Sequence, residues 1–216
     1  MLAGAGAGSA DAAAPAPAAS ARYADTAEYR ARRAAFEREP ARPGAVVFLG
    51  DSLTAGGNWD ARWPAAARPV LNRGLPGDRV RDVAARVREV ARHRPAAVFL
   101  MAGINDLVFE RRGADAVARD LEALVRRLRA QCPTATIFVQ SVLPASAAVA
   151  ADVRRLNGRL ARAAPRLGAR YVDLYPAMAS PGGALRDGLS ADGLHLAPAA
   201  YALWAGAVGP LVDGER

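Results

Sequence analysis

The chain has 216 residues, of which 52% are hydrophobic, and this length suits one domain with a single sizeable core. All 29 basic residues are arginine, which excludes a Schiff-base lysine and the lysine of a phosphate-binding P-loop. The net charge of +8 is spread over several segments rather than clustered, which favours a solvated surface over a nucleic-acid-binding face.

The N-terminal segment is low in complexity. Residues 1–20 are mostly Ala, Gly, Pro and Ser, without the basic n-region or strongly apolar h-region of a signal peptide. We therefore expect a flexible tail and a cytoplasmic protein. Residues 21–38 have a helix-forming composition, and Pro40 and Pro43 close that segment, which predicts an N-terminal helical extension over residues 21–44. The main domain is expected over residues 45–216.

Five short apolar runs follow, each of strand length and rich in β-branched or aromatic residues. They span residues 45–50, 69–74, 96–103, 134–142 and 169–175. Nearly continuous apolar runs suit strands that are buried on both faces, which indicates a parallel sheet of about five strands.

Apolar residues recur at helical spacing between these runs, and each set predicts the buried stripe of one helix. The sets are Val80, Val83, Val87 and Val90; Leu121, Leu124 and Leu128; Leu156 and Leu160; and Tyr201, Trp204, Val208 and Leu211 after Pro198. Strands that alternate with helices predict right-handed βαβ units, and hence an α/β fold with a three-layer α/β/α sandwich. In such sheets the active site lies beyond the carboxyl ends of the strands.

Polar or glycine-rich clusters follow the predicted strands at this edge. They are residues 50–54 (GDSLT), 72–78 (NRGLPGD), 103–106 (GIND) and 192–195 (DGLH, before the last helix). Four segments that are distant in sequence therefore converge at one edge, which indicates a site more strongly than any single motif does.

The residue types in these clusters suit nucleophilic catalysis. A serine hydroxyl needs a base to take its proton, and Ser52 on a strand-to-helix turn would face His195 as general base and acid. Asp192, three residues before His195, would orient the imidazole and stabilise its cationic form. The backbone N–H groups of Ser52 and Gly77 and the side-chain amide of Asn105 are candidate donors to the developing oxyanion.

Each of these residues also has a structural interpretation that the sequence leaves open. Ser52 could cap a helix, Gly77 and Asn105 could be turn residues, and Asp192 and His195 could belong to a surface loop. All of these structural interpretations would have to be true at once for the chain to lack a catalytic site at this edge.

Other polar and aromatic residues near the motifs have simpler interpretations. His93 lies away from the predicted site edge and is interpreted as structural. Asp51 and Asp106 are expected to hold their loops together. For Trp59 and Trp63, a place in an acyl pocket and a place in ordinary packing are equally open.

The combination of motifs resembles the SGNH (GDSL) hydrolase family over roughly residues 45–210, and within it bacterial relatives of platelet-activating-factor acetylhydrolase catalytic subunits. The resemblance implies a flavodoxin-like fold, no metal, no cofactor, and ester hydrolysis through an acyl-enzyme. It matches Ser52, Asp192 and His195 to the triad, and Gly77 and Asn105 to the oxyanion residues. It leaves the substrate open, because Pro76, Arg79 and Ile104 beside the cleft differ from the residues common in relatives.

The leading hypothesis is a serine esterase that acts on a small-molecule acyl ester. An acyltransferase would use the same acyl-enzyme with an alcohol in place of water, and the intact site argues against a non-catalytic binding module. The single Cys132 excludes an intrachain disulfide, and with two histidines the sequence argues against a His/Cys-rich zinc site. No apolar stretch predicts a membrane span. The oligomeric state is open, and the resemblance is compatible with a homodimer.

Overall fold

A parallel sheet of five strands lies at the centre of the structure, a computed structural model that describes residues 26–214. The strands are β1 (Val46–Gly50), β2 (Val70–Gly74), β3 (Ala97–Met101), β4 (Thr136–Gln140) and β5 (Arg170–Val172), in the order β2-β1-β3-β4-β5. Every strand lies within one of the five apolar runs, so the predicted parallel α/β sheet is confirmed. The expected tail of residues 1–20 falls outside the described residues.

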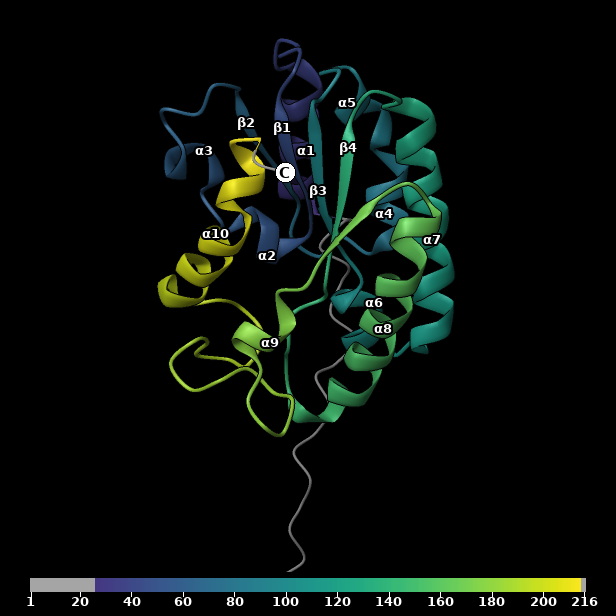
Figure 1. The fold of residues 1–216 in the computed structure, drawn as a ribbon, viewed down its shortest axis with the longest axis vertical. Coiled ribbons are helices and arrows are strands. Elements are labelled where there is room, and N and C mark those ends of the chain that lie inside the picture. Colours follow the sequence, from purple (N-terminus) through teal and green to yellow (C-terminus); the bar gives the residue numbers. More distant parts are fainter. Residues whose placement is uncertain (1–25, 215–216) are drawn as a thin grey trace, which may run out of the picture.

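Helices cover both faces of the sheet and complete the three layers (Figure 1). One face carries α4 (Val80–Ala85), α5 (Val87–Ala91), α7 (Ala114–Gln131) and α8 (Ala150–Arg166), with α7 in contact with the other three. The other face carries α3 (Trp59–Arg62) and α10 (Pro198–Val212). Short helices follow the strands: α2 (Ser52–Ala55), α6 (Ile104–Val108), the 3₁₀ helix η2 (Ala147–Val149) and α9 (Tyr175–Met178).

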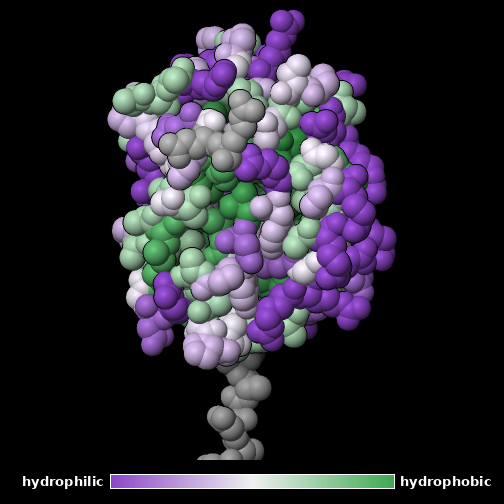
Figure 2. All heavy atoms as spheres, viewed as in Figure 1, coloured by the Kyte–Doolittle hydropathy of each residue, from purple (hydrophilic) through white to green (hydrophobic). Residues whose placement is uncertain are grey.

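The outer surfaces of the two helical layers differ in character. Figure 2 shows hydrophilic residues over α7 and α8 and hydrophobic residues over α10. Several arginines of the hydrophilic side pair with acids, as Arg155 and Arg159 do with Asp115. Within residues 26–214, no helix has both the length and the apolar content needed to cross a membrane.

A stack of aromatic rings fills the core beneath α3 and α10. Phe48, Phe99 and Phe138 occupy paired register positions on β1, β3 and β4, and neighbouring ring centroids lie 4.8 and 4.5 Å apart. Trp59 of α3 extends the stack at 4.3 Å from Phe48, and Trp204 of α10 meets Trp59 edge to face at 4.8 Å. Trp59 is fully buried, so of its two interpretations the structure supports core packing.

One predicted helix is divided in two. The stripe Val80, Val83, Val87 and Val90 is buried as expected, but the backbone leaves helical geometry at Arg86, where φ is −114° and ψ is 14°. Hydrophobic spacing did not reveal the break because the four valines face the core on both sides of it. The other three stripes lie on α7, α8 and α10 as predicted.

Helix α1 (Ala27–Arg38) comes from the predicted extension and is attached to the sheet through its C-terminal end. Its last turn is followed by Glu39, and Glu39 Oε2 accepts a hydrogen bond from the Arg73 guanidinium of β2 at 2.6 Å. The same guanidinium lies 4.6 Å from the centroid of the Phe36 ring. Arg92 also donates to the backbone carbonyls of Glu37 and Glu39. The helix ends before Pro40, as predicted.

The aromatic stack predicts a large loss of stability on truncation. Phe99→Ala removes the central ring, and we expect it to lower the free energy of unfolding by about 3–5 kcal/mol, measured by urea denaturation. The matched control is Phe109→Ala, because the Phe109 residue is 58% exposed and its loss should change stability by no more than about 0.5 kcal/mol. Equal effects of the two substitutions would contradict the packing described here.

Candidate active site

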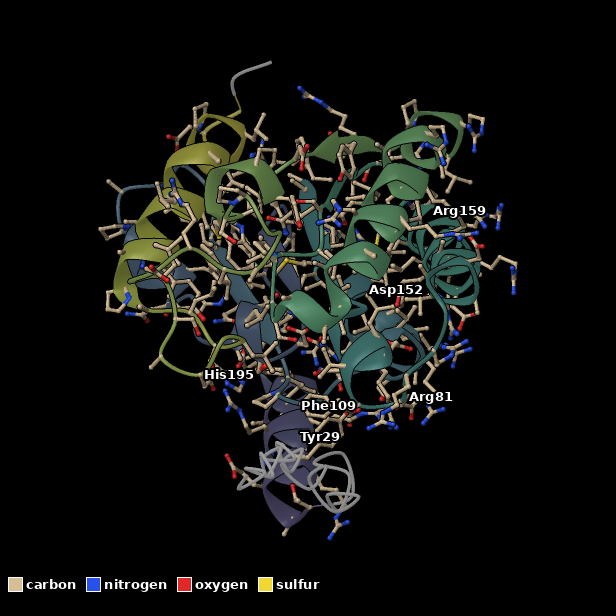
Figure 3. The ribbon with its side chains drawn as sticks, turned by 90° about the horizontal axis from the view of Figure 1, so that it is seen from below. Tyr29, Arg81, Phe109, Asp152, Arg159 and His195 are labelled. Carbon is tan, nitrogen blue, oxygen red and sulfur yellow. The ribbon has the colours of Figure 1, made fainter. Side chains whose placement is uncertain are left out.

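The four motif segments meet at the carboxyl edge of the sheet, which is seen from below in Figure 3. Ser52 begins α2 directly after β1, and Asn105 is the second residue of α6 after β3. Gly77 lies in the turn between β2 and α4, and Asp192 and His195 lie in the loop between α9 and α10. The structure therefore brings all five predicted site residues to one end of the molecule.

The turn that presents Ser52 depends on its two preceding residues. A Cβ on Gly50 would lie 2.2 Å from the Met101 carbonyl oxygen and 2.3 Å from Thr54 Oγ1, so only glycine fits. Asp51 caps α2, since its Oδ1 accepts the Leu53 N–H at 3.0 Å. Asp51, and not Ser52, is therefore the N-cap residue of α2. The Ser52 side chain is half-buried and does not cap the helix.

Asp192 holds His195 through side-chain and backbone bonds. Asp192 Oδ2 lies 2.7 Å from His195 Nδ1, and Asp192 Oδ1 accepts the N–H groups of Leu194 and His195 at 2.9 and 2.7 Å. The bond to the His195 ring, followed by those backbone bonds, lowers the pKa of Asp192. An ionised Asp192 therefore favours a proton on Nδ1 and leaves Nε2 as the free base nitrogen. Both side chains are exposed, at 57% for His195 and 55% for Asp192.

Ser52 and His195 lie at the same end, but no hydrogen bond between their side chains is present in the part of the chain that the structure describes. Catalytic hydrogen bonds are often long in an unliganded site and shorten when substrate binds.

The three candidate oxyanion donors come from the start of α2, the turn after β2 and the start of α6. As the first residue of that helix, Ser52 has an N–H without an acceptor inside the helix. Gly77 has a φ of 75°, a conformation that favours glycine. The buried Asn105 donates from Nδ2 to the Asp78 carbonyl oxygen at 2.8 Å, which uses one of its two amide protons. This bond also ties α6 to the turn after β2.

A buried ion pair supports that turn. Arg86 Nε donates to Asp78 Oδ2 at 2.7 Å, and the other end of the guanidinium donates from Nη2 to the Gly50 carbonyl oxygen at 2.8 Å. The second carboxylate oxygen of Asp78 accepts the hydroxyl of Tyr29, from α1, at 2.7 Å. Burial raises the pKa of Asp78, and the charge of Arg86 opposes that rise.

Sequence reasoning missed Arg86 and Tyr29. The one local signal for Arg86 was its position inside a stripe of buried valines, where a solvated arginine would not fit. Tyr29 carried no signal, because its partner lies 49 residues away.

The loop role expected for Asp106 agrees with its contacts. Its Oδ2 accepts the Val80 N–H at 3.0 Å, and its Oδ1 accepts from Arg112 at 2.9 Å. Asp106 thus joins the start of α6 to the start of α4. Nothing in this arrangement directs Asp106 toward a substrate.

His93 is structural, as interpreted from sequence. It is fully buried before β3, its Nδ1 accepts the Arg42 N–H at 3.0 Å, and its Nε2 lies 3.2 Å from Glu89 Oε1. Burial lowers the pKa of His93, which favours a neutral ring. Across residues 26–214, no group of three or more His, Cys, Asp or Glu side chains is arranged to hold a metal ion.

Residues 48–203 match the family described as GDSL-like lipase/acylhydrolase. The chain belongs to this family. The match contains Ser52, Gly77, Asn105, Asp192 and His195, whereas α1 lies outside it. A search of curated proteins with this GDSL-like acylhydrolase sequence finds no match.

Solved structures of similar fold include three bacterial or fungal hydrolases. A GDSL-like lipase from Bacteroides thetaiotaomicron has 22% identity and a TM-score of 0.75, covering 90% of this chain and 100% of that one. A lipase/acylhydrolase from Enterococcus faecalis has 23% identity and a TM-score of 0.66, covering 79% and 96%. A family 3 carbohydrate esterase from Talaromyces cellulolyticus has 20% identity and a TM-score of 0.62, covering 78% and 96%. At these identities the likeness shows the fold alone.

A further structure bears on the resemblance to platelet-activating-factor acetylhydrolases. It is a protein from Streptococcus pneumoniae whose name refers to platelet activating factor, with 18% identity and a TM-score of 0.71. The match covers 85% of this chain and 90% of that one. The family match confirms the suspected GDSL-like family, and the pneumococcal structure shows a shared fold.

The buried Asp51 predicts a pH-dependent stability. Burial raises the pKa of Asp51 to about 7, so the folded protein holds this proton to higher pH than the unfolded chain does. The free energy of unfolding should therefore fall as the pH rises from the ordinary pKa of an aspartate toward 7. Asp51→Asn keeps an oxygen for the Leu53 N–H and removes the ionisation. We expect its free energy of unfolding, relative to the native chain, to increase by on the order of 2 kcal/mol between pH 5 and pH 8.

The control for this prediction is Asp60→Asn, because Asp60 is exposed on α3. Its difference from the native chain should be the same at both pH values. Thermal and urea unfolding at pH 5 and pH 8 measure both variants, and a flat difference for Asp51→Asn would contradict the burial argument.

Proposed function

We propose that this protein is a serine esterase that cleaves carboxylic esters through an acyl-serine intermediate on Ser52. The observation that carries the proposal is the 2.7 Å contact between Asp192 Oδ2 and His195 Nδ1. It lies at the same edge of the sheet as Ser52, which begins α2 and does not cap it. A nucleophile, a base and an orienting carboxylate are the three parts that acyl transfer to serine requires. Membership in the GDSL-like lipase/acylhydrolase family supports the same chemistry.

In the first step, His195 Nε2 takes the proton of the Ser52 hydroxyl while Oγ forms a bond to the ester carbonyl carbon. Ionised Asp192 stabilises the imidazolium that results. The carbonyl oxygen gains negative charge and accepts hydrogen bonds from the N–H groups of Ser52 and Gly77 and from the free amide proton of Asn105. The bond to the alcohol then breaks, and His195 returns its proton to the leaving oxygen.

In the second step, water attacks the acyl group on Ser52 and His195 takes a proton from that water. Collapse of the second tetrahedral intermediate releases the carboxylic acid and regenerates the serine. An alcohol in place of water would make the same site an acyltransferase. The exposure of His195 to solvent supports hydrolysis, since water reaches the base freely. A panel of esters from acetyl to long-chain acyl, including acetylated sugars, with and without alcohol acceptors, would establish the substrate class.

Covalent labelling tests the nucleophile. A serine-directed fluorophosphonate should add to the intact protein once, at Ser52, because His195 can take the hydroxyl proton there. Mass spectrometry of peptides locates the label, and Ser52→Ala should abolish it. A label on another residue of an active preparation would refute the proposed mechanism.

Asn105→Ala tests the oxyanion donor. Negative charge develops only as the tetrahedral intermediate forms, so loss of the amide should lower kcat with little change in KM. We expect kcat to fall by about 10²–10³-fold in steady-state ester hydrolysis. Asn105→Asp should be at least as harmful, because it places a negative charge beside the oxyanion. A folded Asn105→Ala variant with near-normal kcat would show that Asn105 is only a turn residue.

A further inference from the structure

Helix α1 carries a buried hydroxyl group, that of Tyr29, which lies at the active-site end of the molecule. Tyr29 is buried and donates through its hydroxyl to Asp78 Oδ1 at 2.7 Å, across 49 residues of sequence. Figure 3 shows Tyr29 projecting from α1 in the view onto the carboxyl edge, with His195 in the same view. Burial, followed by the charge of Asp78, raises the pKa of Tyr29, so its hydroxyl remains a donor.

Asp78 is placed so that a shift of its backbone would move two candidate oxyanion donors. It directly follows Gly77, and its carbonyl oxygen accepts the amide of Asn105 at 2.8 Å. Its carboxylate is fully buried, with one oxygen bound by Tyr29 and the other by Arg86. Removal of either partner leaves a buried carboxylate oxygen without a donor, a costly state that favours rearrangement of the loop.

We propose that Tyr29 is a positioning residue, which holds the turn at residues 75–79 through Asp78 and so aligns Gly77 and Asn105 for the oxyanion. The inference rests on the proposed esterase function. It gives α1, an element outside the family match, a part in turnover without contact with substrate. Displacements of about 1 Å in a catalytic constellation are sufficient to reduce turnover severely, so the effect of one remote hydroxyl can be measured.

The test compares two tyrosines that each donate one hydroxyl hydrogen bond. Tyr29→Phe should lower kcat about 10-fold with KM within about twofold, because the misplaced donors serve the transition state. Tyr175→Phe is the matched control, since the Tyr175 hydroxyl donates to the Gly183 carbonyl at 3.0 Å and touches no part of the turn. It should leave kcat unchanged even where its melting temperature falls equally.

A double-mutant comparison identifies the route of the effect. Because Asn105 is one of the two donors that Tyr29 aligns, Tyr29→Phe should lower kcat by clearly less than 10-fold in an Asn105→Ala background, where only Gly77 can still be displaced. Equal fold-losses in both backgrounds would overturn the route through Asn105. A Tyr29→Phe variant with native kcat and a lowered melting temperature would show that α1 contributes stability alone.

Hydrogen exchange keeps the inference testable if the ester chemistry proves wrong. Tyr29→Phe should speed amide exchange at Leu75 and at residues 77–79, and Tyr175→Phe should not. Unchanged exchange there would overturn the positioning role. Failure of the proposed function looks different: the native chain would hydrolyse no ester in the panel and take no phosphonate label at Ser52, while the exchange result would stand by itself.

Discussion

The buried pair of Arg86 and Asp78 is the interaction on which the site end of the molecule depends. Charges withdrawn from water are costly, and this pair offsets the cost with two further hydrogen bonds, from Arg86 to the Gly50 carbonyl and from Tyr29 to Asp78. Three elements that are separate in sequence therefore share one hydrogen-bonded centre. The end of β1, the turn after β2 and the N-terminal helix could not move independently without breaking a hydrogen bond to this buried pair.

The two halves of the candidate site are built differently. On the oxyanion side, Asn105 is buried and held by a long-range contact with the Asp78 carbonyl, while Ser52 and Gly77 are half-buried. The base side is local, because Asp192 holds His195 within one short, exposed loop. A fixed oxyanion side suits a group that must be aligned before the reaction begins. An exposed base suits the exchange of leaving alcohol for water.

The sequence predicted the sheet well because each strand carries its own signal. The five apolar runs, the leucine stripes of α7 and α8 and the motif glycines all act over a few residues. Local pattern also placed Ser52, Asn105 and His195 at one edge, since the carboxyl ends of parallel strands coincide. The break at Arg86 and the contact of Tyr29 with Asp78 were not predictable in this way. Both depend on side chains that meet only after the chain has folded, and no spacing along the sequence encodes such a meeting.

The aromatic stack has a consequence for spectroscopy. All three tryptophans of the chain, Trp59, Trp63 and Trp204, lie within this one cluster on the α3 and α10 side of the sheet. Intrinsic fluorescence therefore reports on one half of the molecule, and the layer of α7 and α8 is invisible to it. Opening of that second layer would go undetected by tryptophan emission, whereas far-ultraviolet circular dichroism would report the loss of its helices. The order in which the two halves lose structure can thus be read from two optical signals without introducing a label.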